Sequence, residues 1–191
     1  MRDSVGLTLL SQGIDITSEE SLTEDAFNAA VEFIAAQVSS GQIFNIKGNS
    51  YGEDLTNGNI IVALAWSGDT TILNAEVGEE RFGFVVPDTG STISSDSFVV
   101  PMGSSHKKNA EALINYYYDP VNAAELAAYV NYVTPVVGAK EEMLKTDPEL
   151  AENPLIFPSE EFLANVHAFR ALTGQEEQRF ATAWQNVLLG A

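Results

Sequence analysis

The feature that most constrains this chain is an unbroken apolar run within residues 58–69, Gly-Asn-Ile-Ile-Val-Ala-Leu-Ala-Trp-Ser-Gly-Asp. Continuous apolar residues rich in β-branched side chains are typical of a strand that is covered on both faces. In open α/β sheets, ligands bind beyond the carboxyl ends of such strands. We therefore expect Trp66 and Asp69, which close the run, to lie where a ligand is met.

Two further segments have strand-like composition. Residues 81–87 end at Pro87, and residues 97–100 are followed by Pro101. Proline donates no backbone hydrogen bond, so it is typical of a strand end. The three segments predict an α/β domain whose strands lie mainly in the first half of the chain.

Helical periodicity and capping residues mark the other elements. Asp3 is the predicted N-cap of a helix over residues 3–12, and Ser21 with Glu24 predicts a capping box for a helix that ends near Gly41. Further helices are predicted over residues 52–57 and 109–118, from Pro120 after an Asp119 N-cap, and from a capping box at Thr173 and Glu176. Most of the chain after the loop before Asp96 is therefore expected to be helical. That loop is the predicted boundary between two domains, residues 1–93 and residues 94–191.

Composition excludes several classes of function. The 191 residues hold 27 acids and 9 bases, a formal charge of −18, which argues against a nucleic-acid partner and favours cationic ligands. The chain has no cysteine and two histidines, and it contains no phosphate-binding glycine loop, nucleophile motif or metal motif. The sequence therefore predicts neither an enzyme nor a cofactor or metal site.

What remains is a set of acids and aromatics at predicted strand ends and turns. Carboxylates pair with ammonium groups, and aromatic faces pack on methylenes and cations, so these residue types suit a polyvalent organic cation. Each of them also has an ordinary structural role open to it, as a cap, a loop acid or a core aromatic. The residues are Asp3, Trp66, Asp69, Asp96 and Tyr132.

The order of short motifs along the chain resembles the spermidine/putrescine-binding proteins of ABC transporters. The motifs are Asp3-Ser4, Gly58 through Gly68, Phe84-Val-Val-Pro87, Ser95-Asp-Ser-Phe-Val-Val-Pro101, Ala112-Leu-Ile-Asn115, Asp119-Pro120 and Tyr132-Val-Thr-Pro135. The resemblance implies a periplasmic-binding-protein-like fold of type II, in which two α/β lobes close on a polyamine. It assigns 1–93 to the second lobe, and 94–191 to a crossing strand and the C-terminal helices of the first lobe, with most of the N-terminal lobe missing.

The resemblance also implies a function and a location. It implies an extracytoplasmic solute-binding component, periplasmic or a cell-surface lipoprotein, that captures putrescine or spermidine and delivers it to an ABC permease. Trp66 matches a tryptophan that packs on the ligand, Tyr132 an aromatic wall, Asp96 an acid that pairs with an ammonium group, and Asp3 a second acid.

Three positions depart from the family pattern. Ser94 stands where a tryptophan is often found, Gly6 where a glutamate is expected, and Arg170 where a glutamine falls. Ser94 and Arg170 are therefore weaker candidates for ligand contact. Relative to the family pattern, the chain therefore lacks one acid and one aromatic and has one additional cation. The ligand could therefore also be a smaller diamine or a different small solute.

A different class of function stays open as well. The chain could form a stand-alone acidic α/β interaction domain with Trp66 in its core. If the resemblance holds, the missing lobe predicts weak ligand affinity for this chain alone, and uncovered apolar surface predicts self-association.

Overall fold

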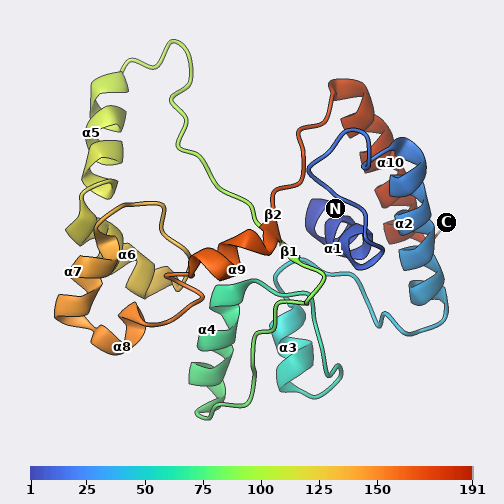
Figure 1. The fold of residues 1–191 in the computed structure, drawn as a ribbon, viewed down its shortest axis with the longest axis horizontal. Helices are drawn as coiled ribbons and strands as arrows, with labels where there is room; N and C mark the ends of the chain where they lie inside the picture. The colour runs from blue at the N-terminus through green and yellow to red at the C-terminus, as the bar shows by residue number, and fades with distance from the viewer. Residues whose placement is uncertain (191) are drawn as a thin grey trace. The chain divides into compact units, whose positions relative to one another are not determined.

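The computed structural model describes residues 1–190, which are mostly helical (Figure 1). The helices are α1 (Arg2–Ser11), α2 (Glu24–Ser39), α3 (Tyr51–Thr56), α4 (Ser67–Val77), α5 (Lys107–Tyr117), α6 (Pro120–Val130), α7 (Ala139–Thr146), α8 (Pro148–Ala151), α9 (Glu160–Ala164) and α10 (Gly174–Leu189). Two short strands, β1 (Ser91–Thr92) and β2 (Val166–His167), pair in parallel, with Ser91 opposite Val166. None of the described helices is long and apolar enough to cross a bilayer.

The chain divides into two compact units that are interleaved along the sequence. Unit 1 contains Met1–Ala65, Val85–Ser94 and residues 164–190, and unit 2 contains Trp66–Phe84 and Ser95–Leu163. One crossing between the units falls after Ser94, next to the predicted boundary. The assignment of 1–93 and 94–191 to two lobes stays a prediction.

Unit 1 is built on a core shared by α1, α2 and α10. The rings of Phe27 and Phe180 stack with their centroids 3.8 Å apart, and Val5, Leu9 and Ile34 are buried beside them. The capping box predicted at the start of α10 is confirmed, because Glu176 N donates to Thr173 Oγ1 at 3.3 Å and the Glu176 carboxylate accepts from Thr173 N at 2.7 Å.

Two predicted caps in unit 1 are wrong. The N-cap of α2 is Thr23, whose hydroxyl accepts from Ala26 N at 3.2 Å, so Ser21 lies before the cap. The N-cap of α1 is Met1, and Asp3 lies within the first helical turn. In both cases the helix begins at a different residue than the capping pattern suggested, although the helix itself was predicted.

Unit 2 has a core of small side chains supplied by α6, α7 and α8. The predicted cap of α6 is confirmed, because the Asp119 carboxylate accepts from Val121 N at 3.0 Å and Pro120 is the first helical residue. Ala127, Met143 and Ile156 are among the buried residues of this core. In contrast, α5 buries no residue.

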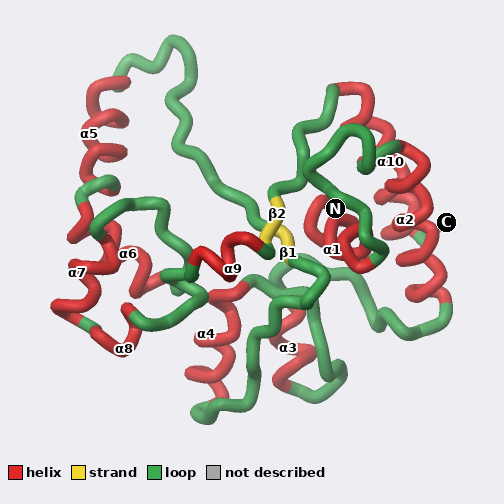
Figure 2. The backbone as a smooth tube through the Cα atoms, viewed as in Figure 1, coloured by secondary structure: helices red, strands yellow, loops and turns green. Residues whose placement is uncertain are grey.

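The three predicted strands are not strands in the described chain. Residues 59–66, 81–87 and 97–100 are irregular, as the loop trace in Figure 2 shows. A strand needs a hydrogen-bonded neighbour, and no neighbouring strand accompanies these segments among residues 1–190. The apolar run is accordingly uncovered: Ile61 is 98% exposed.

Candidate ligand-binding residues

In unit 2, Tyr132 and Asp69 lie side by side although they are far apart in sequence. The Tyr132 hydroxyl donates to Asp69 Oδ1 at 3.1 Å. Asp69 lies in the first turn of α4, and Asn131, with φ of 58°, ends α6 in a left-handed conformation just before Tyr132. Burial, followed by the negative charge of Asp69 and the hydrogen bond to it, raises the pKa of Tyr132 to about 12. The phenol is therefore a stable donor at neutral pH.

A glycine allows this close approach. A Cβ atom at Gly68 would lie 2.8 Å from the Val130 carbonyl oxygen and 3.1 Å from Tyr132 Cζ. Real Cβ atoms do not approach backbone oxygens so closely, so a side chain here would push α4 away from the end of α6. Gly68, which is part of the motif at the end of the apolar run, thereby keeps Asp69 beside Tyr132.

Trp66 is the N-cap residue of α4 and precedes this close contact. Its side chain is 41% exposed, and it belongs to neither buried cluster. The structure thus places Trp66 at a helix start rather than in the core, on the same short segment as Gly68 and Asp69. A carboxylate, a phenol ring and an indole carried by neighbouring turns are groups that suit an organic ammonium ion.

Asp96 and Ser94 lie in the segment between β1 and α5. Both are exposed, and neither forms a hydrogen bond or an ion pair with another residue of the described chain. The structure does not bring Asp96 into contact with Tyr132. The predicted ligand contacts of Asp96 and Ser94 stay predictions.

In unit 1, Asp3 is held by a residue that the sequence did not single out. Thr92 Oγ1 donates to Asp3 Oδ1 at 3.1 Å, which ties the first turn of α1 to the end of β1. A Cβ atom at Gly6 would lie 3.0 Å from Thr92 Cγ2 and 3.3 Å from Phe169 Cδ2. The close approach of Thr92 and Phe169 therefore favours glycine at this position, where the family pattern has a glutamate.

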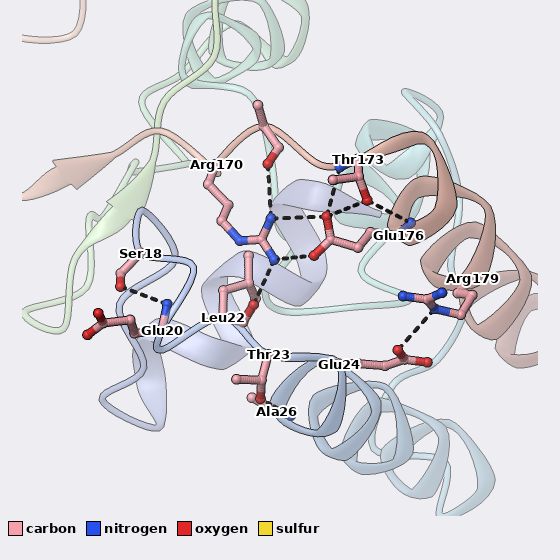
Figure 3. Close-up of polar contacts among 11 residues, drawn as sticks. Ser18, Glu20, Leu22, Thr23, Glu24, Ala26, Arg170, Thr173, Glu176 and Arg179 are labelled. Atoms are coloured by element: carbon pink, nitrogen blue, oxygen red, sulfur yellow. Dashed lines mark hydrogen bonds and ion pairs between the residues drawn. The ribbon is translucent and has the colours of Figure 1, made fainter.

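Arg170 lies inside a network of unit 1 (Figure 3). Its guanidinium donates to Glu176 Oε1 at 2.6 Å and to the Leu22 carbonyl oxygen at 2.9 Å, and its side chain is 7% exposed. The hydrogen bonds from Arg170, followed by those from Thr173, lower the pKa of Glu176 to about 2. The guanidinium thus links the start of α10 to the turn before α2. These contacts favour a structural role, and ligand contact by Arg170 stays a prediction.

Comparison with known proteins identifies the protein family of this chain. The family model described as bacterial extracellular solute-binding protein matches residues 2–158, and the chain belongs to this family. The family is one of binding proteins rather than enzymes. The resemblance inferred from motif order is therefore confirmed at the level of the family.

Curated relatives include polyamine-binding proteins. The chain is 28% identical over 144 residues to a putrescine/agmatine-binding protein of Pseudomonas aeruginosa, which covers 72% of this chain and 38% of that protein. It is also 28% identical over 152 residues to a putrescine-binding periplasmic protein of Escherichia coli, covering 74% of this chain and 39% of the relative. The chain thus spans less than two fifths of these relatives' length.

Solved structures support the fold. A putative spermidine/putrescine ABC transporter protein from Listeria monocytogenes matches with a TM-score of 0.79 at 23% identity, covering 97% of this chain and 54% of that one. A spermidine/putrescine ABC transporter substrate-binding protein from Streptococcus pneumoniae matches with a TM-score of 0.76 at 22% identity, covering 99% and 55%. The periplasmic-binding-protein-like fold is confirmed for about half of such a protein, with much less strand than predicted.

Proposed function

We propose that this chain is part of an extracytoplasmic solute-binding component of an ABC importer, which captures a small polyamine-like cation and delivers it to the permease. Its membership of the extracellular solute-binding family, whose model matches residues 2–158, carries the proposal. The curated relatives include putrescine-binding proteins, which supports a diamine as the solute.

The residues of unit 2 give this proposal its chemistry. We infer that Trp66 and Tyr132 pack on the methylenes of the solute and that Asp96 pairs with an ammonium group. Asp69 joins this set, because its carboxylate accepts from the Tyr132 hydroxyl and lies one helical turn after Trp66. The formal charge of −18 adds long-range attraction for any cation.

Asp3 is the proposed second acid, and Ser94 a weaker polar contact. Thr92 fixes one oxygen of Asp3, and Gly6 supplies no carboxylate one turn later. We therefore expect a diamine to bind at least as well as a triamine, because unit 1 offers one acid at this position where the family pattern has two.

Tryptophan fluorescence tests this function on the chain itself. Trp184 is replaced by phenylalanine so that Trp66 is the reporter, and the protein is titrated with putrescine, agmatine and spermidine. Millimolar affinity corresponds to only about 4 kcal/mol of binding free energy, so the titration extends to roughly 10 mM. We expect a saturable change in emission with putrescine, because Trp66 is partly exposed and lies at the start of α4, whose first turn contains Asp69.

Two controls separate binding from ionic strength and from loss of charge. Sodium chloride of matched ionic strength should leave the emission unchanged. Asp96→Ala should remove the response, whereas Asp88→Ala, which removes another exposed acid, should keep it. A response to sodium chloride equal to that to putrescine, or a flat titration with every amine, would overturn the polyamine assignment.

A further inference from the structure

Thr92 is the residue of β1 that holds Asp3, the second acid among the proposed solute contacts. Its hydroxyl donates to Asp3 Oδ1 at 3.1 Å, and both side chains are partly buried. Within residues 1–190, no other group donates a hydrogen bond to the Asp3 carboxylate. The carboxylate therefore has one oxygen fixed by Thr92, whereas Oδ2 has no partner among these residues.

Backbone hydrogen bonds fix the position of Thr92 itself. On one side of it, Ser91 N donates to the Asn165 carbonyl oxygen at 3.0 Å. On the other side, Ile93 N donates to the His167 carbonyl oxygen at 3.1 Å. These two bonds belong to the parallel pair of β1 and β2, so the Thr92 side chain meets the first turn of α1 from a backbone that is held on both sides.

The methyl group of Thr92 sets the direction of its hydroxyl. A Cβ atom at Gly6 would lie 3.0 Å from Thr92 Cγ2, so the methyl group lies against Gly6, one helical turn after Asp3. A β-branched side chain is stiff about χ1, so this contact also orients the hydroxyl toward Asp3. Serine has a hydroxyl that is free to rotate, and valine has no donor. Threonine therefore combines packing at Gly6 with donation to Asp3.

We propose that Thr92 is a positioning residue for solute capture, a role that rests on the proposed function of Asp3 as an acid that binds an ammonium group. The hydrogen bond orders the Asp3 carboxylate before the solute arrives, so binding does not have to immobilise that side chain. An ionised carboxylate accepts several hydrogen bonds, so Oδ2 keeps its capacity to accept from an ammonium group. Thr92 thus acts through Asp3.

The competing role for this bond is structural, because it also ties α1 to β1 within unit 1. Neither Asp3 nor Thr92 belongs to the buried core cluster of that unit, which is built around the stacked rings of Phe27 and Phe180. A structural role predicts that loss of the bond lowers the stability of unit 1 and leaves affinity unchanged. The positioning role predicts that affinity falls while the melting temperature changes little.

Substitutions at Thr92 test the proposal, with putrescine as the ligand and Trp66 as the reporter in the Trp184→Phe background. Thr92→Val keeps the methyl group and removes the donor, so it should weaken putrescine binding about threefold to tenfold. Thr92→Ser keeps the donor and should recover part of this loss. Ser91→Ala is the control, because it removes a neighbouring hydroxyl that forms no hydrogen bond within residues 1–190, and affinity should not change.

Thermal unfolding and a double substitution separate positioning from support. The melting temperature of Thr92→Val should stay within about 4 °C of the parent. Thr92→Val combined with Asp3→Ala should bind putrescine no more weakly than Asp3→Ala alone, because Thr92 then has no carboxylate to position.

The possible outcomes distinguish this role from the proposed function. If the parent binds putrescine and Thr92→Val binds it equally well, or if Thr92→Ser loses as much affinity as Thr92→Val, the positioning role is overturned and the proposed function stands. A double variant that binds more weakly than Asp3→Ala alone also overturns the positioning role. A parent chain that responds to no amine overturns the proposed function, and the role of Thr92 with it.

Discussion

The two units differ in how they are held together. In unit 1, three helices enclose large side chains, with Phe27 stacked on Phe180 and Trp184 beside them. In unit 2, the buried cluster consists of alanines with Met143 and Ile156, and α5 contributes no buried residue. A buried phenylalanine contributes about 1.5–3 kcal/mol more than when it is exposed, whereas an alanine has far less apolar surface to bury.

This difference separates stability from binding. Unit 1 has a core of its own, whereas unit 2 carries Trp66, Asp69 and Tyr132 on a scaffold with a thin core. We therefore expect unit 2 to open at lower denaturant concentration than unit 1, so that unfolding is not a single transition. Single substitutions in each unit test this contrast.

Phe180→Ala should have the largest effect. Removing a fully buried ring that stacks on Phe27 leaves a cavity between α2 and α10, which costs about 3–5 kcal/mol. Urea unfolding followed by Trp184 fluorescence, with Trp66 replaced by phenylalanine, measures the loss. Leu188→Ala on the same helix is the control, since half of its side chain is exposed and the cost should be within about 0.5 kcal/mol. Equal effects of the two substitutions would mean that the stacked pair does not form the core of unit 1.

Met143→Ala should weaken unit 2 alone. Met143 is buried among the alanines of α6 and α8, and its truncation costs about 2 kcal/mol, at the low end for such changes, because the thin core is free to collapse around it. Amide hydrogen exchange should become faster in α6 and α7. Exchange in α1, α2 and α10 should stay unchanged, and faster exchange there would contradict the independence of the two units.

The sequence predicted α1, α2, α3, α5, α6 and α10 because their signals are local, whereas α4, α7, α8 and α9 were not predicted. The Asp119-Pro120 start of α6 and the Thr173–Glu176 capping box need only a few adjacent residues, and both are confirmed. The strands failed for the opposite reason. Whether Ile61 belongs to a strand depends on neighbouring strands, and none lies beside it among residues 1–190. Apolar composition alone does not tell which strands are neighbours.

The candidate site was predictable only in part. Motif order named Trp66 and Tyr132 as candidates, whereas it matched Asp69 to no ligand contact of the family. The Tyr132–Asp69 bond joins residues 63 apart in sequence, and the Thr92–Asp3 bond joins residues 89 apart. No local pattern encodes such pairs. The sequence signal for Asp69 was its position at the end of the apolar run, next to Gly68, whose close approach to the end of α6 requires glycine.

Glu176→Gln tests the polar network that supports the core of unit 1. The pKa of Glu176 is depressed from 4.5 to about 2, so its charge stabilises the fold above pH 4.5, and this contribution is lost as pH falls through about 2. The melting temperature of the parent should therefore fall across that window. The variant should start lower and depend less on pH, so that the two curves converge at low pH. Glu177→Gln is the matched control, because the ion pair of Glu177 with Arg2 is about half exposed and contributes little. Parallel curves for the parent and Glu176→Gln would contradict the role of the Arg170–Glu176 pair.

Asp69→Asn should have the smallest effect on stability and a clear effect on titration. Burial is the largest cause of the raised pKa of Tyr132, and the Asp69 charge is the next, so the amide should bring that pKa from about 12 part of the way back toward 10. Absorbance at the tyrosinate band measures the shift, and Tyr132→Phe identifies which transition belongs to this residue. Because the raised pKa favours the neutral phenol, the bond stabilises unit 2 below pH 10 and is lost as pH rises through about 12. An unchanged titration would mean that Asp69 and Tyr132 are not in contact in solution. In that case the first turn of α4 would not be fixed against the end of α6, and unit 2 would lack the polar contact that joins Asp69 to Tyr132.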